Sequence, residues 1–359
     1  MIEYEKVNQL LYKLTHSSEI EQEINNLNVI KYLAQMILEN TPIQRIQNQP
    51  TFVPLQESLQ TATDFFHEFN QDYEYIFQNF LQEKNTYQGY EDIGIRFFKI
   101  RKEGEALEVN GQSQTNNSML FFEGNIRIDY SEEPMDIYSI VHESVHKLSL
   151  AKDSWTNFQN LFYEVPSITS EFLLTDYLLD AKKYPENEIK ILKNNRLQSL
   201  MTYAAYDMCF ITVLEIYQKK GVVNEELIKT HISNLASNSI TTRIFSQCMN
   251  AFLQSILSER LLLFDAERYI VGLTLACYMH QKIMDNPDKK EKLFQLIHLL
   301  GEPNYLEKET FLKAEQLDIP IIKDGQLYID DQVLQNLYHS YGKEISSIAE
   351  IKKKETRTP

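Results

Sequence analysis

Residues 142–146 read His-Glu-Ser-Val-His, and this HExxH pattern constrains the chain more than any other feature of its sequence. In a helix, side chains four residues apart lie on the same face, so His142 and His146 would point toward one metal ion. Glu143 would reach a water molecule at that ion and could take its proton. The pattern predicts a helix with two metal ligands and a base. The alternative is a helix that carries two histidines without a metal.

The residues around this motif also favour a helix. Pro134 suits a first helical turn, and Ser131 or Glu133 could cap the helix start. Apolar residues recur downstream at helical spacing, at Ile137, Ile140, Val141, Val145 and Leu148. We therefore expect one face of this helix to pack into a core.

A third ligand is available downstream. Zinc sites for hydrolysis use three protein ligands and leave the fourth position to water. Glu164 and Glu171 lie seven residues apart, so both would share one face of a second helix. If that face meets the first helix, Glu164 would bind the metal and Glu171 would orient a ligand histidine. The alternative is an acidic helix edge, which is common in a chain with 51 acidic residues.

Three segments in this order, residues 124–130, 137–146 and 164–171, resemble the core of the M3 metallopeptidases, the oligopeptidase F and thimet oligopeptidase type. The resemblance spans roughly residues 85–320. It implies a mainly α fold, with a zincin-like (gluzincin) catalytic core that contains a small antiparallel β-sheet surrounded by helices. It also implies one zinc ion (Zn2+) held by His142, His146 and Glu164, with Glu143 as general base.

The chain departs from this family close to the motif and in length. The family usually has a glycine at the fourth HExxH position and a histidine three residues after the motif. Val145 and Ser149 stand at these positions here. Family members that cleave oligopeptides are also much longer, largely through an N-terminal helical region over the cleft. A shortened lid suggests a more open cleft or a dedicated substrate.

The substrate-binding residues that the M3 family carries late in the chain are only partly present here. The family carries a histidine and several tyrosines there, which bind substrate and stabilise the oxyanion. Tyr269 matches one tyrosine and is the first candidate for an oxyanion donor, whereas the histidine position falls near Leu263. Arg268, Tyr278 and His280 are nearby residues that could substitute.

Two further sets of residues are candidates for substrate contact. In peptidases of this type, a strand before the HExxH helix lines the cleft and pairs with an extended peptide. Ile126 and Ile128 lie on one face of that predicted strand, and an ordinary edge strand is the alternative. Tyr203 and Tyr206 would face one side of a helix, where they could bind substrate or be buried. Tyr278 is a further candidate for substrate binding.

Apolar periodicity and its breaks divide the chain into three regions. We expect an N-terminal helical region at residues 1–90 and an M3-like zinc peptidase core at 91–320. Residues 321–359 are expected to form a C-terminal hairpin, a helix and a frayed tail.

Charge and composition limit the kinds of molecule that the chain is expected to bind. The formal net charge of −16 disfavours nucleic acid and anionic membranes. No run of eighteen apolar residues and no secretory signal is present, and three widely spaced cysteines fit reduced thiols. These features predict a cytoplasmic location without a membrane span.

The sequence therefore predicts a zinc-dependent metalloendopeptidase that hydrolyses peptide bonds in oligopeptides or in one dedicated precursor. A second class stays open, because most substrate-clamping tyrosines of the family are missing. In this alternative the chain is a peptide-binding or regulatory protein that retains zinc with little or no catalysis. The presence of Glu143 argues against a pure binder, which has no need of a base.

Overall fold

The structure is a computed structural model of the 359-residue chain. It describes residues 2–15, 20–40, 51–82, 95–99, 107–109, 112–114, 119–120, 126–149, 161–235, 246–254, 263–301, 307–324, 326–328 and 330–340.

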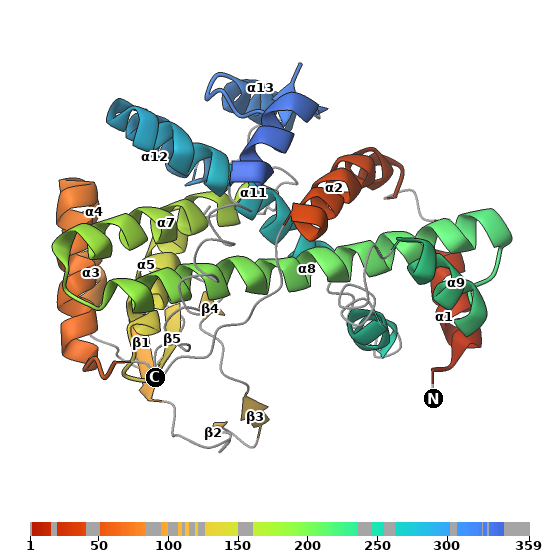
Figure 1. Cartoon of the computed structure of the whole chain (residues 1–359), viewed down its shortest axis with the longest axis horizontal. Helices are drawn as coiled ribbons and strands as arrows, with labels where there is room; N and C mark the ends of the chain where they lie inside the picture. The colour runs from red at the N-terminus through yellow and green to blue at the C-terminus, as the bar shows by residue number, and fades with distance from the viewer. Residues whose placement is uncertain are drawn as a thin grey trace, which may run out of the picture.

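The described part of the chain is mainly helical, as the sequence predicts (Figure 1). Its helices are α1 (Tyr4–Thr15), α2 (Ile20–Asn40), α3 (Leu55–Phe69), α4 (Gln71–Gln82), α5 (Met135–Leu148), α7 (Glu164–Ala181), α8 (Glu186–Lys220), α9 (Glu225–Leu235), α11 (Leu263–Asp285), the short 3-10 helix η1 (Pro287–Lys289), α12 (Lys290–Gly301) and α13 (Glu307–Glu315). Residues 246–254 and 331–340 are also helical.

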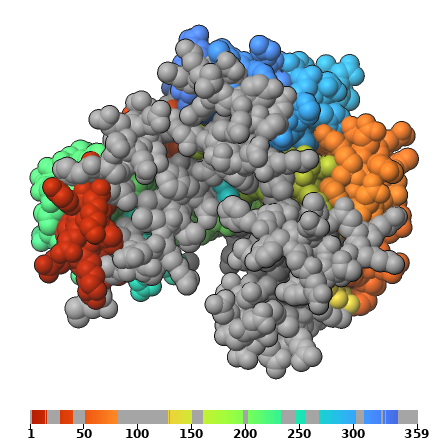
Figure 2. Space-filling view, turned by 180° about the vertical axis from the view of Figure 1, so that it is seen from behind, coloured from red at the N-terminus to blue at the C-terminus, as the bar shows by residue number. Residues whose placement is uncertain are grey.

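The helix α8 runs along most of the molecule and contacts α1, α2, α7, α9 and α11 (Figure 1). The space-filling view shows α1 and the pair α3–α4 at opposite ends (Figure 2). By length and hydropathy alone α8 could cross a membrane, but 67% of that apolar window is buried inside the protein. Such burial is the pattern of a core helix.

The strands form a mixed sheet, not the antiparallel sheet that the sequence predicts. β1 (Ile95–Lys99) is parallel to β5 (Ile126–Tyr130), and β4 (Met119–Leu120) is antiparallel to β5, in the order β1-β5-β4. Alternating side chains indicate strands but not their direction, and the connection between β1 and β5 is long enough for a parallel crossover. β5 is therefore the central strand, and the ordinary edge strand of the alternative interpretation is also wrong.

Two short hairpins complete the strands. β2 (Leu107–Val109) pairs with β3 (Gln112–Gln114), and β6 (Ile322–Lys323) pairs with β7 (Gln326–Leu327), each antiparallel. The second pair is the predicted C-terminal hairpin. The predicted tail from residue 351 onward lies outside the described residues.

One buried cluster unites the N-terminal helices with the rest of the chain. It includes Phe66 of α3, Ile137 of α5, Phe172 of α7 and Ile283 of α11. Because α3 packs on α5, and α7 packs on both α5 and α11, the HExxH helix lies between supporting elements. This packing determines the direction in which His142 and His146 of α5 point.

The start of α5 differs in detail from the sequence prediction. Neither Ser131 nor Glu133 caps the helix with its side chain. Instead the buried Asp136 carboxylate accepts hydrogen bonds from the backbone N–H groups of Ser131, at 3.0 Å, and of Glu133, also at 3.0 Å. The acceptor is therefore the Asp136 side chain in the first turn of α5, and its donors belong to the loop that precedes the helix.

Candidate metal centre

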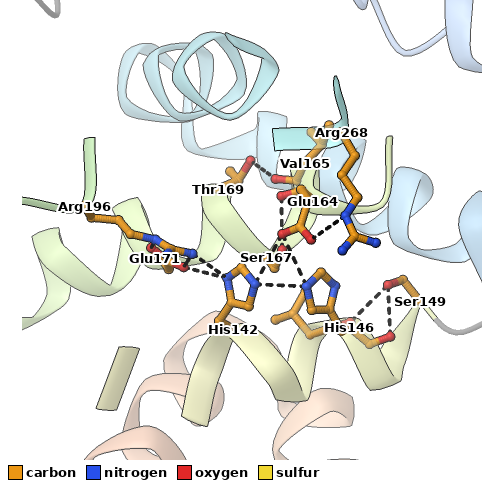
Figure 3. A network of polar contacts seen from close by, with 11 residues as sticks. His142, His146, Ser149, Glu164, Val165, Ser167, Thr169, Glu171, Arg196 and Arg268 are labelled. Carbon is orange, nitrogen blue, oxygen red and sulfur yellow. Dashed lines mark hydrogen bonds and ion pairs between the residues drawn. The ribbon is translucent and has the colours of Figure 1, made fainter. Parts of the chain in front are cut away.

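Two histidine rings from α5 face one another in the interior of the protein. His142 and His146 are both buried, and their Nε2 atoms lie 2.9 Å apart with the ring planes nearly perpendicular. The four-residue spacing on a helix produces this arrangement, because it places both side chains on one face. Both rings thus present a nitrogen to the same point (Figure 3).

Glu164, the first residue of α7, completes a group of three donor atoms. Its Oε2 lies 3.3 Å from Nε2 of His142 and 3.4 Å from Nε2 of His146. The side chain is almost fully buried and points down toward both rings (Figure 3). Its place at the helix start is favourable, since the N-terminal end of a helix dipole stabilises negative charge. This group of three residues could hold a metal ion.

The donor spacing fits a small tetrahedral ion. Zinc–nitrogen and zinc–oxygen bonds of about 2.0–2.1 Å imply about 3.3 Å between neighbouring ligand atoms in a tetrahedron. The separations of 2.9, 3.3 and 3.4 Å in this group lie close to that value. Within the described residues, Oε2 of Glu164 is buried without a hydrogen-bond partner. A bound cation would satisfy that oxygen.

Behind His142, a carboxylate and a guanidinium fix the orientation of the ring. Glu171 of α7 lies 2.5 Å from Nδ1 of His142, on the side opposite Nε2. Arg196 of α8 donates two hydrogen bonds to Glu171, from Nε at 2.8 Å and from Nη2 at 2.9 Å. Such a carboxylate–histidine pair is the usual support of a metal-binding imidazole. The sequence pattern indicated Glu171 but not Arg196, which reaches this place only because α8 packs on α7.

Tyr163 supports the second histidine. Its ring stacks on His146 with 4.0 Å between centroids and 6° between planes, and it is buried. Tyr163 directly precedes Glu164, so one short segment supplies both a candidate ligand and a wall for the ring of another. Sequence reasoning did not single out Tyr163, and no pattern in the sequence marks it.

A third group of residues comes from α11 and α8. Arg268 lies with its Nε 3.6 Å from Oε1 of Glu164. The next residue, Tyr269, stacks on Tyr203 with 4.3 Å between ring centroids. The negative charge of Glu164, followed by burial, raises the pKa of Tyr269 well above its usual range, so its hydroxyl stays protonated. Arg268 thus lies beside Glu164, Tyr269 lies within reach of the charge of Glu164, and Tyr203 packs against Tyr269.

Charge is distributed unevenly over the two histidines. Burial opposes charge on both rings, but in His142 the carboxylates of Glu171 and Glu164 outweigh it and raise the pKa to about 10. In His146, burial and the positive charge of His142 outweigh Glu164 and lower the pKa to about 4. Of the two rings, His142 is therefore the one that carries the positive charge, and a metal ion bound at its Nε2 would replace the proton on that nitrogen.

Glu143 stands beside this group on α5. It is buried, and the loss of hydration raises its pKa to about 7 despite the nearby positive charge of His142. A carboxylate with a pKa near neutrality can both accept and release a proton under ordinary conditions. The motif thus places a carboxylate that could act as a base next to the candidate ligand His142.

Other candidates lie away from the centre. Tyr278 is about two and a half turns further along α11 than Tyr269, next to Lys282. His280 is buried and bonds to Asp176 at 2.6 Å. Ile128 is fully buried in the core, so a peptide could not contact its side chain. The side chain of Ile126 lies outside the described part of the structure.

Comparison with known proteins adds one distant similarity. No protein-family model matches the chain, and no curated protein matches it. A crystal structure described as a "putative peptidase" from Chlamydophila abortus matches 95% of this chain, with 16% sequence identity and a TM-score of 0.49. The chain spans 55% of the length of that structure. This similarity is too low to assign a family, so the M3 resemblance rests on the sequence motifs alone.

Proposed function

We propose that this protein is a zinc-dependent metallopeptidase that hydrolyses peptide bonds in oligopeptides or in one dedicated precursor. The observation that carries the proposal is the buried group of His142, His146 and Glu164, whose donor atoms lie 2.9–3.4 Å apart. Glu143, the motif residue between the two histidines, adds the base that peptide hydrolysis requires.

The three ligands would hold one zinc ion and leave a position open. When bound, zinc would polarise the substrate carbonyl and lower the pKa of a water molecule. Glu143 would take the proton of the attacking water and deliver it to the leaving amine. Its burial suits this role, since a carboxylate with a pKa raised to about 7 exchanges a proton readily at neutral pH.

Tyr269 is the candidate donor to the oxygen that becomes negative during attack. Its pKa is raised well above the usual range, which keeps the proton on the hydroxyl. Stacking on Tyr203 restrains the ring, and a restrained donor stabilises developing charge without reorganisation. Arg268 beside Glu164 adds positive charge at the same place.

Incubation of the zinc-loaded protein with a diverse mixture of unstructured peptides, followed by mass spectrometry, tests this proposal. We expect cleavage products with the wild type and none with Glu143→Gln, whose zinc content should match that of the wild type. The cut positions would define the sequence preference.

Three results would redirect or contradict the assignment. A wild type that binds one zinc ion and cleaves nothing in the mixture would favour a peptide-binding role, or a single dedicated precursor. Cleavage that persists unchanged in Glu143→Gln would show that the products come from another enzyme or another mechanism. A wild type that binds no zinc would contradict the proposal altogether.

A further inference from the structure

The helix α11 lies unusually close to α7 at the position of Gly272. A Cβ atom built on Gly272 would lie 2.6 Å from Cβ of Glu164, 3.3 Å from the backbone carbon of Glu164 and 3.2 Å from Cδ1 of Ile168. The first of these distances is shorter than two carbon atoms can tolerate. Only glycine, which has no side chain, permits this approach.

The atom that an added methyl group would meet cannot move aside by itself. The Cβ of Glu164 is fixed to the backbone of α7, so a change of side-chain rotamer leaves it in place. Relief of the overlap would require α7 and α11 to separate, or the first turn of α7 to shift. A shift of the first turn of α7 would change the position of the Glu164 carboxylate relative to His142 and His146, and a separation of the helices would remove the contact that holds it there.

The same contact also fixes the place of other residues on α11. Arg268 precedes Gly272 by one helical turn, so both lie on the face of α11 that meets α7. Arg268 there approaches Oε1 of Glu164 at 3.6 Å, and the adjacent Tyr269 stacks on Tyr203. The distance between the two helices therefore sets the position of a ligand, of a cation and of a phenol together.

We infer that Gly272 is a positioning residue of the metal centre: its missing side chain lets α11 press against α7 and hold Glu164 at the two histidines. This inference rests on the proposed function only in assuming that His142, His146 and Glu164 bind zinc. Gly272 does not touch the metal or the substrate, and it acts through Glu164.

The test compares two identical substitutions at different helix contacts. Gly272→Ala introduces the overlap with Glu164. Gly301→Ala is the matched control, because its Cβ would lie 3.8 Å from the carbonyl oxygen of Leu148 at the end of α5, an ordinary contact. Zinc affinity is measured by competition with a chromophoric chelator, and the fold by circular dichroism of the metal-free proteins.

We expect Gly272→Ala to bind zinc about 10- to 100-fold more weakly than the wild type, the range seen when the supports of metal ligands are lost. Gly301→Ala should bind zinc as the wild type does. The absorption spectrum of the cobalt-substituted protein gives a second readout. In Gly272→Ala it should change toward that of Glu164→Ala, because both lack a well-placed carboxylate ligand.

A double-mutant cycle shows whether Gly272 acts through Glu164. In the Glu164→Ala background the ligand is already absent, so adding Gly272→Ala should cause no further loss of zinc affinity. An equal loss in both backgrounds would overturn the inference, because the effect would then be independent of Glu164.

Other outcomes also decide the matter. If Gly272→Ala does not fold, Glu164→Gly removes the Cβ that the new methyl group meets and should restore the fold. Failure of that rescue would overturn the inference. Unchanged zinc affinity in Gly272→Ala, with normal binding by the wild type, would overturn it and leave the proposed function intact. Absence of zinc binding by the wild type would overturn both.

Discussion

At the scale of single residues, the proposed function assigns the binding of a metal and the transfer of a proton to different side chains. His142 and His146 present nitrogen atoms 2.9 Å apart, whereas the motif residue between them, Glu143, is buried beside the group. A substitution of Glu143 and a substitution of a histidine should therefore have different effects. Zinc content and turnover report on the two tasks independently.

The first prediction uses this separation. Glu143→Gln should keep the zinc content of the wild type and lower turnover by about 10²- to 10⁴-fold, the usual contribution of a general base. His142→Ala should lose both, because it removes a ligand. Metal content is measured by elemental analysis after gel filtration. Equal zinc in His142→Ala and the wild type would refute the ligand assignment.

The second prediction concerns Arg196, which holds Glu171 with two hydrogen bonds at 2.8 and 2.9 Å. Arg196→Lys keeps the positive charge but loses the paired geometry of the guanidinium. We expect zinc affinity to fall by about tenfold, because Glu171 would orient His142 less well.

The control for that prediction lies on the same helix. Lys190 is at the surface of α8 and pairs only with Glu186 among the ion pairs of the described residues. Lys190→Ala should leave zinc affinity unchanged. If Lys190→Ala and Arg196→Lys lower the affinity equally, the effect of Arg196 is not specific to Glu171.

At the scale of elements, the start of α5 depends on an acceptor inside its first turn. The Asp136 carboxylate accepts backbone N–H groups from Ser131 and Glu133. Burial, opposed by these hydrogen bonds, raises the pKa of Asp136 above its usual value. Burial therefore makes ionisation of Asp136 harder than in the unfolded chain, and the backbone hydrogen bonds offset part of that cost.

A third prediction follows for this turn. Asp136→Ala should lower the free energy of unfolding of the metal-free protein by about 2–3 kcal/mol, because it leaves buried N–H groups without an acceptor. Asp136→Asn keeps one acceptor oxygen and should cost less. Urea unfolding measures both, with the half-buried Asp64 of α3 as control, whose carboxylate accepts a surface hydrogen bond from Gln60. Asp64→Ala should change the value by less than about 0.5 kcal/mol. An equal loss in the Asn and Ala variants would contradict this account.

At the scale of the whole molecule, the centre joins four helices, of which α11 lies far along the sequence from α5, α7 and α8. α5 and α7 supply the candidate ligands, α8 supplies Arg196, and α11 supplies Arg268 (Figure 3). The close contact at Gly272 also comes from α11. A metal ion bound there would link these helices in the folded state and have no equivalent site in the unfolded chain.

The fourth prediction is that zinc stabilises the entire fold. At a free zinc concentration about 100 times the dissociation constant, unfolding should cost about 2.7 kcal/mol more than without metal. Thermal unfolding with zinc and with a chelator measures this difference. His142→Ala should show no zinc-dependent change. A stabilisation of equal size in that variant would place the bound metal elsewhere in the protein.

The sequence by itself determined the features that depend on local spacing. The HExxH pattern puts two histidines on one helical face, and the seven-residue interval puts Glu164 and Glu171 on another, whatever the rest of the chain does. Helical content followed from apolar periodicity in the same way. These predictions needed only the geometry of a single helix, and the structure places these side chains around a single point.

Only the tertiary structure decided which elements meet. Arg196, Tyr163 and Gly272 carry no local signal, because their roles arise from contacts between helices distant in the sequence. The parallel pairing of β1 with β5 was mispredicted for the same reason. The burial of Ile128 and the contact of Tyr278 with Lys282 also depend on packing that no local pattern shows. Spacing along one element fixes the direction of a side chain, but the packing of several elements fixes what that side chain touches.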